Sequence, residues 1–352
     1  MTLRNITLRN ITLLTMLAAL PGFGQAPTAA GFWNTKGNFA GTGRCAECHP
    51  KQAERFRENS MSRALESVDQ CAILQGDIHF TFHQGPYSYS ISRAGGQIVY
   101  KVTRGKDSFE TPLTYAFGQG KAGQTYVYSL NGQYFETRVS YYARLKNLDL
   151  TVGTMTGTPS DIQTAAGRVM QGNEPRNCFG CHTTGARIGT TLQLSSYQAG
   201  VQCEACHGPA GVHLAAPGIS TIRTLKNMTP QQANEFCGAC HRTREAVVAM
   251  GIRGLDSARF PAYRLANSAC FSMDDPRISC TACHDPHGPL VTEDSYYDSK
   301  CNACHDAGKK HCPVSRKNCT SCHMQRVEPA ASHHAFADHW IRVVKGKADY
   351  PE

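Results

Sequence analysis

The stretch CEACHGPAGVH, residues 203–213, contains two cysteines separated by two residues and a histidine directly after the second cysteine. Another histidine, His213, follows six residues later, beyond a Gly-Pro bend. The Cys-x-x-Cys-His pattern occurs seven times in the 352 residues and uses 14 of the 17 cysteines. Every Cys-x-x-Cys in the chain is followed by histidine, although the chain has only 15 histidines. Such a regular repeat is not a chance arrangement.

This spacing is the one that attaches haem c covalently. The two thiols bind the two vinyl groups, and the next imidazole reaches the iron as its proximal ligand. Zinc clusters and dithiol redox sites also use paired cysteines, but neither requires a histidine after every pair. The sequence therefore predicts seven haem c groups. The attaching residues are Cys45, Cys48, Cys178, Cys181, Cys203, Cys206, Cys237, Cys240, Cys280, Cys283, Cys301, Cys304, Cys319 and Cys322, and the proximal ligands are His49, His182, His207, His241, His284, His305 and His323.

Eight further histidines could close the irons from the distal side. We expect this role for His213, His287 and His339. Because His213 and His287 each lie close in sequence to a proximal histidine, each should cap a neighbouring haem. The haem at residues 45–49 could take His79 or His83, which would share one face of a strand, or Met61, or it could stay open. The other candidates are His311, His333 and His334.

The first residues have the pattern of an export signal. Arg4 and Arg9 precede an apolar run at residues 11–20 that is too short to span a bilayer. The sequence thus predicts a signal peptide over 1–26, with cleavage between residues 26 and 30, and a periplasmic or extracellular protein without a later transmembrane segment. The formal charge of +9 does not indicate nucleic acid, because the propionates of seven haems would bring it to about −5.

The motifs are spaced unevenly along the chain. The second motif starts 133 residues after the first, and the last six are crowded into the C-terminal half. Strand patterns fill the long interval, with a hairpin expected at Asn131-Gly132 and a turn at Gly95-Gly96. Thr229 and Pro230 predict a helix start before Cys237. We therefore expect a first haem segment over 31–74, a β-rich insertion over 75–150 and a six-haem domain over 151–345.

The expected fold is mainly α-helical and irregular, is packed around its haems, and carries a small antiparallel β module inserted after the first haem motif. With so few residues per cofactor, neighbouring haems should touch. The three cysteines outside the motifs are Cys71, Cys270 and Cys312, and an exported protein could join two of them in a disulfide.

The chain resembles the multihaem cytochromes c, in the superfamily that includes the tetrahaem electron acceptor of hydroxylamine oxidoreductase. The resemblance lies in residues 45–64, 116–142, 203–213, 269–288 and 319–341. It implies distal-ligand roles for His213, His287, His333 and His339, and also for His311 and His83, with His334 as the spare histidine. It also implies a disulfide between Cys270 and Cys312. Gln325 stands where the family usually has proline.

Two functions are consistent with these features. The first is electron relay along closely packed low-spin haems, with an electron donor and an acceptor protein as partners and with self-association into haem chains as an extension. The alternative is an oxidoreductase that acts on a small nitrogen or sulfur oxyanion at one haem with an open axial position. The relay is favoured because the histidines suffice to close every iron and because the chain lacks the Cys-x-x-Cys-Lys motif of lysine-ligated reductases of the superfamily.

Overall fold

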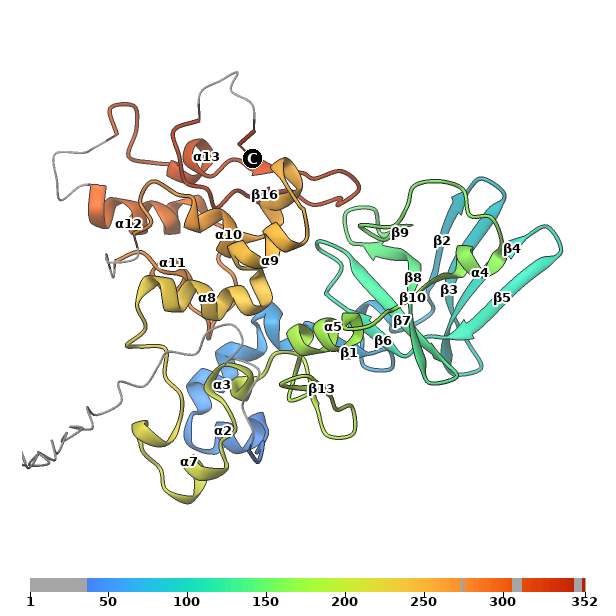
Figure 1. Cartoon of the computed structure of the whole chain (residues 1–352), viewed down its shortest axis with the longest axis horizontal. Coiled ribbons are helices and arrows are strands. Elements are labelled where there is room, and N and C mark those ends of the chain that lie inside the picture. Colours follow the sequence, from blue (N-terminus) through green and yellow to red (C-terminus); the bar gives the residue numbers. More distant parts are fainter. Residues whose placement is uncertain (1–36, 273–274, 276, 306–311, 345–349, 352) are drawn as a thin grey trace, which may run out of the picture.

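Helices and strands occupy different ends of the molecule (Figure 1). A computed structural model describes residues 37–272, 275, 277–305, 312–344 and 350–351. The predicted signal peptide and His311 lie outside these ranges. We refer to residues 65–169, which contain most of the strands, as the strand arm, and to the remaining described residues as the helical part.

Each Cys-x-x-Cys-His motif lies at the C-terminal end of a helix. This placement has a geometric reason, because residues three and four apart share one face of a helix. Two cysteines at i and i+3 and a histidine at i+4 therefore face the same side. The seven helices are α2 (Thr42–Cys48), α5 (Glu174–His182), α6 (Cys203–His207), α8 (Pro230–His241), α11 (Cys280–Cys283), α12 (Asp294–His305) and α13 (Cys319–His323).

Helix α8 begins where the sequence predicts. Thr229 accepts a hydrogen bond from the Gln232 backbone N–H, and the Gln232 side chain accepts one from the Thr229 N–H, while Pro230 occupies the first turn. This capping box satisfies two amide donors that would otherwise lack partners. The predicted helix start before Cys237 is confirmed.

Short connecting helices complete the helical part. They are α3 (Pro50–Arg57), η1 (Ser60–Arg63), α7 (Gly211–Ala215), η3 (Ile219–Thr221), α9 (Arg244–Ala249), η4 (Gly254–Arg259) and α10 (Pro261–Ala266). Three small strand pairs accompany them: β11 (Thr183–Thr184) with β14 (Gln198–Ala199), β12 (Arg187–Ile188) with β13 (Thr191–Leu192), and β15 (Arg326–Val327) with β16 (Phe336–Ala337).

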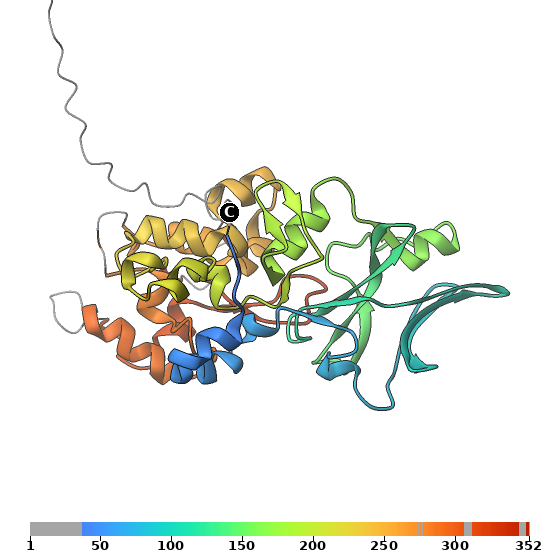
Figure 2. The ribbon, with the colours of Figure 1, turned by 90° about the horizontal axis from the view of Figure 1, so that it is seen from below.

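The strand arm contains two antiparallel sheets. The first has the order β2 (His79–Gln84), β3 (Tyr87–Ala94), β4 (Gln97–Arg104) and β5 (Asp107–Pro112). The second has the order β1 (Leu65–Ser67), β6 (Tyr115–Phe117), β7 (Gln124–Leu130), β8 (Gln133–Tyr142) and β10 (Gly167–Val169), and β9 (Asn147–Leu150) also pairs with β8. Two short helices, η2 (Ala72–Leu74) and α4 (Ile162–Ala166), complete the arm. Figure 2 shows the sheets as separate layers.

Both predicted tight turns are present. Asn131 and Gly132 connect β7 to β8 with φ values of 50° and 76°, and Gly95 and Gly96 connect β3 to β4 with 57° and 81°. Two consecutive positive φ values are typical of the type I′ turn, whose twist matches that of paired strands. The hairpin predicted at Asn131-Gly132 is therefore confirmed.

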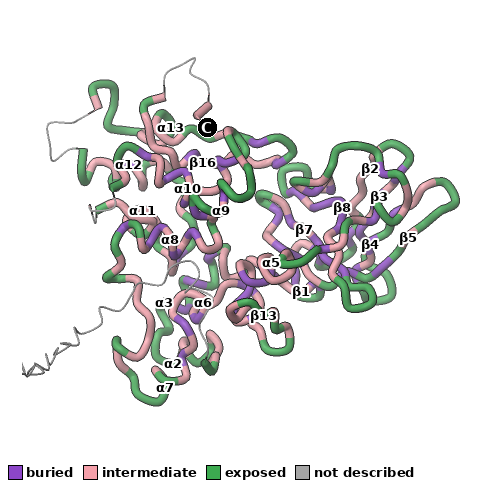
Figure 3. Tube along the Cα trace, viewed as in Figure 1, coloured by how far each residue is buried: buried purple, intermediate pink, exposed green. Residues whose placement is uncertain are grey.

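The strand arm has a core of its own. The two sheets meet through aromatic rings, with Tyr100 and Tyr128 centroids 6.3 Å apart and Phe80 and Tyr141 centroids 4.8 Å apart. Figure 3 shows buried residues along these strands. In the described residues beyond 200, by contrast, the buried apolar side chains are Ala210, Ala233, Phe236, Val247, Ala258, Ala262 and Leu265. So few and such small side chains would make a marginal core by themselves.

Candidate haem sites

Three pairs of histidine rings face each other in the helical part. The ring centroids of His49 and His213 lie 6.5 Å apart, those of His207 and His287 lie 5.9 Å apart, and those of His284 and His339 lie 6.1 Å apart. Two metal–nitrogen bonds of about 2 Å, plus about 1 Å from each nitrogen to its ring centre, would separate two axial imidazoles by about 6 Å. Each pair therefore has the spacing of two ligands on opposite sides of one iron.

Each of these pairs joins a motif histidine to a histidine outside the motifs. His213 belongs to α7 and faces His49 rather than the nearby His207. His287 likewise faces His207 and not His284, which is three residues away. Every pair therefore connects segments that are distant in sequence.

Backbone carbonyls orient three of the motif histidine rings. The Nδ1 atom lies 2.8 Å from the Ala64 carbonyl in His182, 2.9 Å from the Arg223 carbonyl in His207 and 2.9 Å from the Arg342 carbonyl in His323. A carbonyl can only accept, so Nδ1 carries the proton and Nε2 keeps its lone pair. This is the tautomer and orientation in which a histidine binds metal through Nε2.

The distal candidates are held in the same way. The Nδ1 atom of His339 lies 3.0 Å from the Ala337 carbonyl, and that of His213 lies 3.2 Å from the Gly218 carbonyl. Burial lowers the pKa of His339 to about 4 and also lowers the pKa of His182 and His241. These imidazoles are therefore neutral near pH 7, which is the form that binds metal.

Thiols of different motifs lie within hydrogen-bonding reach of each other. Cys45 contacts Cys203, and Cys301 contacts Cys319. Helix α8 has two such contacts, from Cys240 to Cys181 and from Cys237 to Cys280. Figure 1 shows the motif helices running from α2 through α8 to α13, with α5 beside the strand arm. Groups attached at these cysteines would therefore be neighbours.

Comparisons with known proteins agree with this arrangement. The family described as cytochrome c554 and c-prime matches residues 44–79 and 153–208. The multiheme cytochrome MtrA of Shewanella baltica (strain OS185) is 24% identical over 184 residues, which cover 45% of this chain and 55% of that protein. The crystal structure of the outer cell wall cytochrome OcwA has a TM-score of 0.53 at 15% identity, over 87% of this chain and 80% of that one, and so shows a shared fold. These findings support a place for the chain in the multihaem cytochrome c family.

The parts of the chain that the family model matches lie on either side of the strand arm. The family match ends at residue 79 and resumes at residue 153. Most of the strand arm, from β2 to β9, thus lies outside the match, while the motifs at 45–49, 178–182 and 203–207 lie inside it. The chain also spans only about half the length of MtrA, since the match covers 55% of that protein.

Three arginines of the chain each have one buried nitrogen that fits the carboxylates of haem. No hydrogen-bond partner meets Arg176 Nε, Arg223 Nη1 or Arg259 Nε within the described ranges. A buried N–H group without a partner is unfavourable, and carboxylates are the best partners of a guanidinium. The fourteen motif cysteines, the ring pairs and these arginines together form a donor set that suits covalently bound haem c.

Several predicted residues lie elsewhere. His79 and His83 are exposed on β2, and His83 Nδ1 lies 3.0 Å from Ser88 Oγ. His333 Nε2 lies 2.8 Å from Asp149 Oδ2, and the His334 ring packs against Phe336. Met61 belongs to η1. The structure thus brings none of these side chains to the ring of His49, which faces His213 instead.

The cysteines outside the motifs are free thiols. The expected disulfide between Cys270 and Cys312 is not formed, and this prediction is wrong for the structure at hand. Cys270 is exposed and Cys312 is half-buried, and the charge that raises the pKa of the Cys270 thiol comes from Cys304, after the larger effect of burial. Cys71 is buried in the strand arm, where its thiol donates to Gln124 Oε1 at 3.3 Å.

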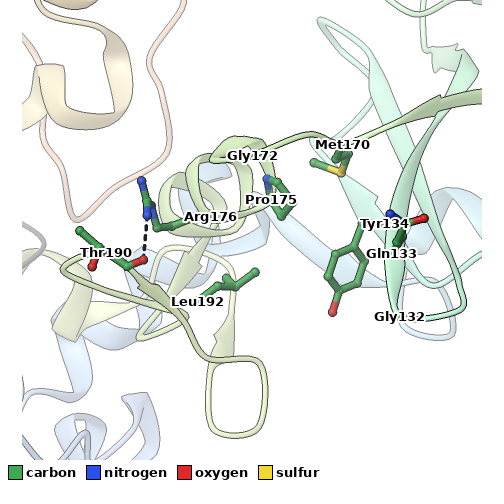
Figure 4. Close-up of a pocket in the computed structure, with 9 residues that line it drawn as sticks. All are labelled: Gly132, Gln133, Tyr134, Met170, Gly172, Pro175, Arg176, Thr190 and Leu192. Atoms are coloured by element: carbon green, nitrogen blue, oxygen red, sulfur yellow. Dashed lines mark hydrogen bonds between the residues drawn. The ribbon is translucent and has the colours of Figure 1, made fainter.

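A surface cavity of about 340 Å³ lies between α5 and the β7–β8 turn. Figure 4 shows Tyr134, Met170 and Pro175 on one side and Thr190 and Leu192 on the other, with Arg176 donating to the Thr190 carbonyl at 2.7 Å. None of its lining residues is a motif cysteine or histidine. The cavity is therefore separate from the haem-attachment residues.

Sequence reasoning did not identify the carbonyls that orient the rings. Ala64, Ala337, Arg223 and Arg342 act through the backbone, so their side chains leave no pattern. The orphan atoms of Arg176, Arg223 and Arg259 were missed for a related reason. Many arginines are spread along the chain, and only packing shows which of them are buried.

Proposed function

We propose that this multihaem cytochrome c carries seven haem c groups and relays electrons along them between a donor and an acceptor protein. The observation that carries the proposal is the contact between motifs, since Cys45 meets Cys203, and α8 meets both Cys181 and Cys280. Bound haem supplies an iron that alternates between the ferrous and ferric states. Close attachment points keep successive irons near each other.

Histidines of the chain would close three of the proposed sites on both sides of the iron. His213, His287 and His339 would hold the distal positions at the motifs whose proximal histidines they face. The carbonyls of Ala64, Arg223 and Arg342 fix the proximal rings, so little reorganisation accompanies a change of oxidation state. An iron with two imidazoles has no position for a substrate, which supports relay over catalysis at these three motifs.

We further propose that the protein acts outside the cytoplasm, in the periplasm or at the cell surface. The expected signal peptide supports this location, and so does the likeness to a structure titled outer cell wall cytochrome. In the part of the chain that the structure describes, no helix has the length and apolar character needed to cross a membrane. Fractionation of cells that express the full chain would test the location.

The first experiment is low-temperature EPR of the mature protein, expressed with haem-maturation machinery and with its haem content measured by mass. We expect seven haems and low-spin ferric signals only. A high-spin signal equivalent to one haem per chain would contradict the closed relay. It would favour the alternative of an oxidoreductase for a small nitrogen or sulfur oxyanion, and addition of nitrite or hydroxylamine would then be expected to change that signal.

A further inference from the structure

The turn that carries His287 is held by a segment that follows the first motif. His287 lies after α11, outside any helix or strand, and its ring centroid is 5.9 Å from that of His207. Helix α3 starts directly after His49, the histidine of the first motif, and Asn59 follows the end of this helix. Asn59 reaches the turn although 227 residues separate it from Pro286 in the sequence.

The side-chain amide of Asn59 uses both of its N–H groups and its oxygen. Its Nδ2 donates to the Pro286 carbonyl at 3.1 Å and to the Gly288 carbonyl at 2.6 Å, while its Oδ1 accepts from the Met61 N–H at 2.9 Å. A carbonyl can only accept and a backbone N–H can only donate, so these partners fix which way the amide faces. The two carbonyls belong to the residues on either side of His287. Asn59 therefore holds the backbone of this histidine from both sides.

Burial makes the Asn59 contacts stronger than a second contact to the same turn. Asn59 is only 8% exposed, and a buried polar group that loses its hydrogen-bond partner is costly. The second contact is an ion pair of 2.7 Å between Arg55 and Asp285, whose carboxylate also accepts from the His287 N–H at 2.9 Å. The Arg55 and Asp285 side chains are 60% and 38% exposed, and an ion pair so open to water contributes little. Of these two contacts, the one from Asn59 fixes the turn.

The first and third motifs, at 45–49 and 203–207, support each other. His213 follows the third motif and faces His49 in the first. Asn59 follows the first motif and holds the turn of the histidine that faces the third. Each motif is thus followed by a segment that serves the other motif.

Glu204 fixes the two motifs relative to each other. Its buried carboxylate accepts hydrogen bonds, each 2.8 Å long, from the N–H groups of Ala40, Gly41 and Ala210. Ala40 and Gly41 lead into α2, which carries the first motif, and Ala210 precedes α7, which carries His213. Because α3 follows α2 directly, Asn59 is held in place relative to the third motif.

We propose that Asn59 is a positioning residue for the iron site at 203–207. It acts through His287, because its hydrogen bonds to the neighbouring carbonyls keep this histidine on the distal side of that site. The segment after one motif therefore controls the axial ligation at another motif. This inference rests on the proposed function, in which His287 is a distal ligand.

EPR of the full mature protein, with haem content confirmed by mass, tests this role. His287→Ala is the reference and should give a high-spin ferric signal equivalent to about one haem per chain. Asn59→Ala should give a high-spin signal no larger than that of the reference, and added imidazole should convert it to low spin. The double variant should show no more high-spin signal than His287→Ala alone, because both changes act on one iron. Ser60→Ala, at an exposed neighbouring position, is the matched control and should keep the wild-type spectrum.

Two results would overturn the proposal. One is an Asn59→Ala spectrum that coincides with wild type, and the other is a double variant whose high-spin signal exceeds that of His287→Ala, since Asn59 would then act on another iron.

Should Asn59→Ala lose a haem by mass, Asn59→Asp decides. Aspartate has nearly the same shape and still accepts from the Met61 N–H, but its ionised carboxylate cannot donate to the two carbonyls. A high-spin signal in this variant supports the proposal, and a wild-type spectrum or the loss of a haem rejects it. If His287→Ala itself gave no high-spin signal, the ligand assignment in the proposed function would fail, so the two failures are distinguishable.

Discussion

At the scale of single residues, five histidines outside the motifs lie in two different environments. His213, His287 and His339 face motif histidines at about the distance that an iron would require, while His79 and His83 are exposed on β2. Residue type is the same in both groups. Two things decide which imidazole can bind metal: its position in the fold, and a hydrogen bond from its Nδ1 to a backbone carbonyl that leaves Nε2 free.

His213→Ala should open one iron. Alanine removes the ring that faces His49 and leaves the motif cysteines intact, so the haem at 45–49 would lose its distal ligand. We expect a high-spin ferric EPR signal equivalent to about one haem per chain. His83→Ala is the matched control, and we expect it to keep the wild-type spectrum because this exposed histidine lies in the strand arm. If the two variants gave the same spectrum, His213 would not be the ligand.

At the scale of elements, turns and caps form where local chemistry demands them. Helix α8 is the clearest case, since it starts at a capping box and ends at His241 while presenting Cys237 and Cys240 to two other motifs. Its first turn is set by neighbouring residues. Its role at the centre of the helical part depends on the helices packed around it.

Thr229→Ala should weaken the start of α8. The substitution removes a side chain that caps the Gln232 N–H, a loss of about 1 kcal/mol. For a chain of this size we expect the melting temperature of the haem-loaded protein to fall by about 2 °C. Gln231→Ala, on the exposed side of the same helix, is the control and should change it by less. Equal melting temperatures for the two variants would argue against the capping box.

Gly132→Ala should destabilise the β7–β8 hairpin. Gly132 has a φ of 76°, and a Cβ added there would meet nothing within 4 Å, so the expected cost of about 1 kcal/mol comes from backbone strain alone. Gly157, which also has open space but no positive φ, provides the control. Hydrogen exchange of the β7 and β8 amides should accelerate in Gly132→Ala and stay unchanged in Gly157→Ala; the reverse order would contradict the strain argument.

At the scale of the whole molecule, the two ends differ in what stabilises them. The strand arm buries a continuous set of aromatic and aliphatic side chains between its sheets, including Tyr87, Tyr100 and Tyr126. The helical part buries few large apolar side chains and brings cysteine motifs together at its centre. The family match, which leaves out most of the strand arm, follows the same division.

Production without haem should therefore unfold one end only. We expect protein made without haem attachment to lose most of its helical circular dichroism, because the helical part buries few large apolar side chains and the proposed haems would have to hold it together. The strand arm should persist as a protease-resistant fragment near residues 65–169, identified by mass spectrometry. The haem-loaded protein, digested in parallel, should resist cleavage in both parts. Cleavage throughout the strand arm of haem-free protein would show that it cannot fold independently.

The sequence alone determined the features that depend on neighbouring residues. Attachment cysteines and proximal histidines lie within five residues of each other, the Asn131-Gly132 turn needs two positive φ values, and the α8 cap needs Thr229 and Gln232. Only the tertiary structure decided which histidine faces which motif, because His213 reaches His49 and His339 reaches His284 across long stretches of chain. The sequence shows which histidines are available as distal ligands. Which motif each of them faces depends on how segments far apart in the chain pack together.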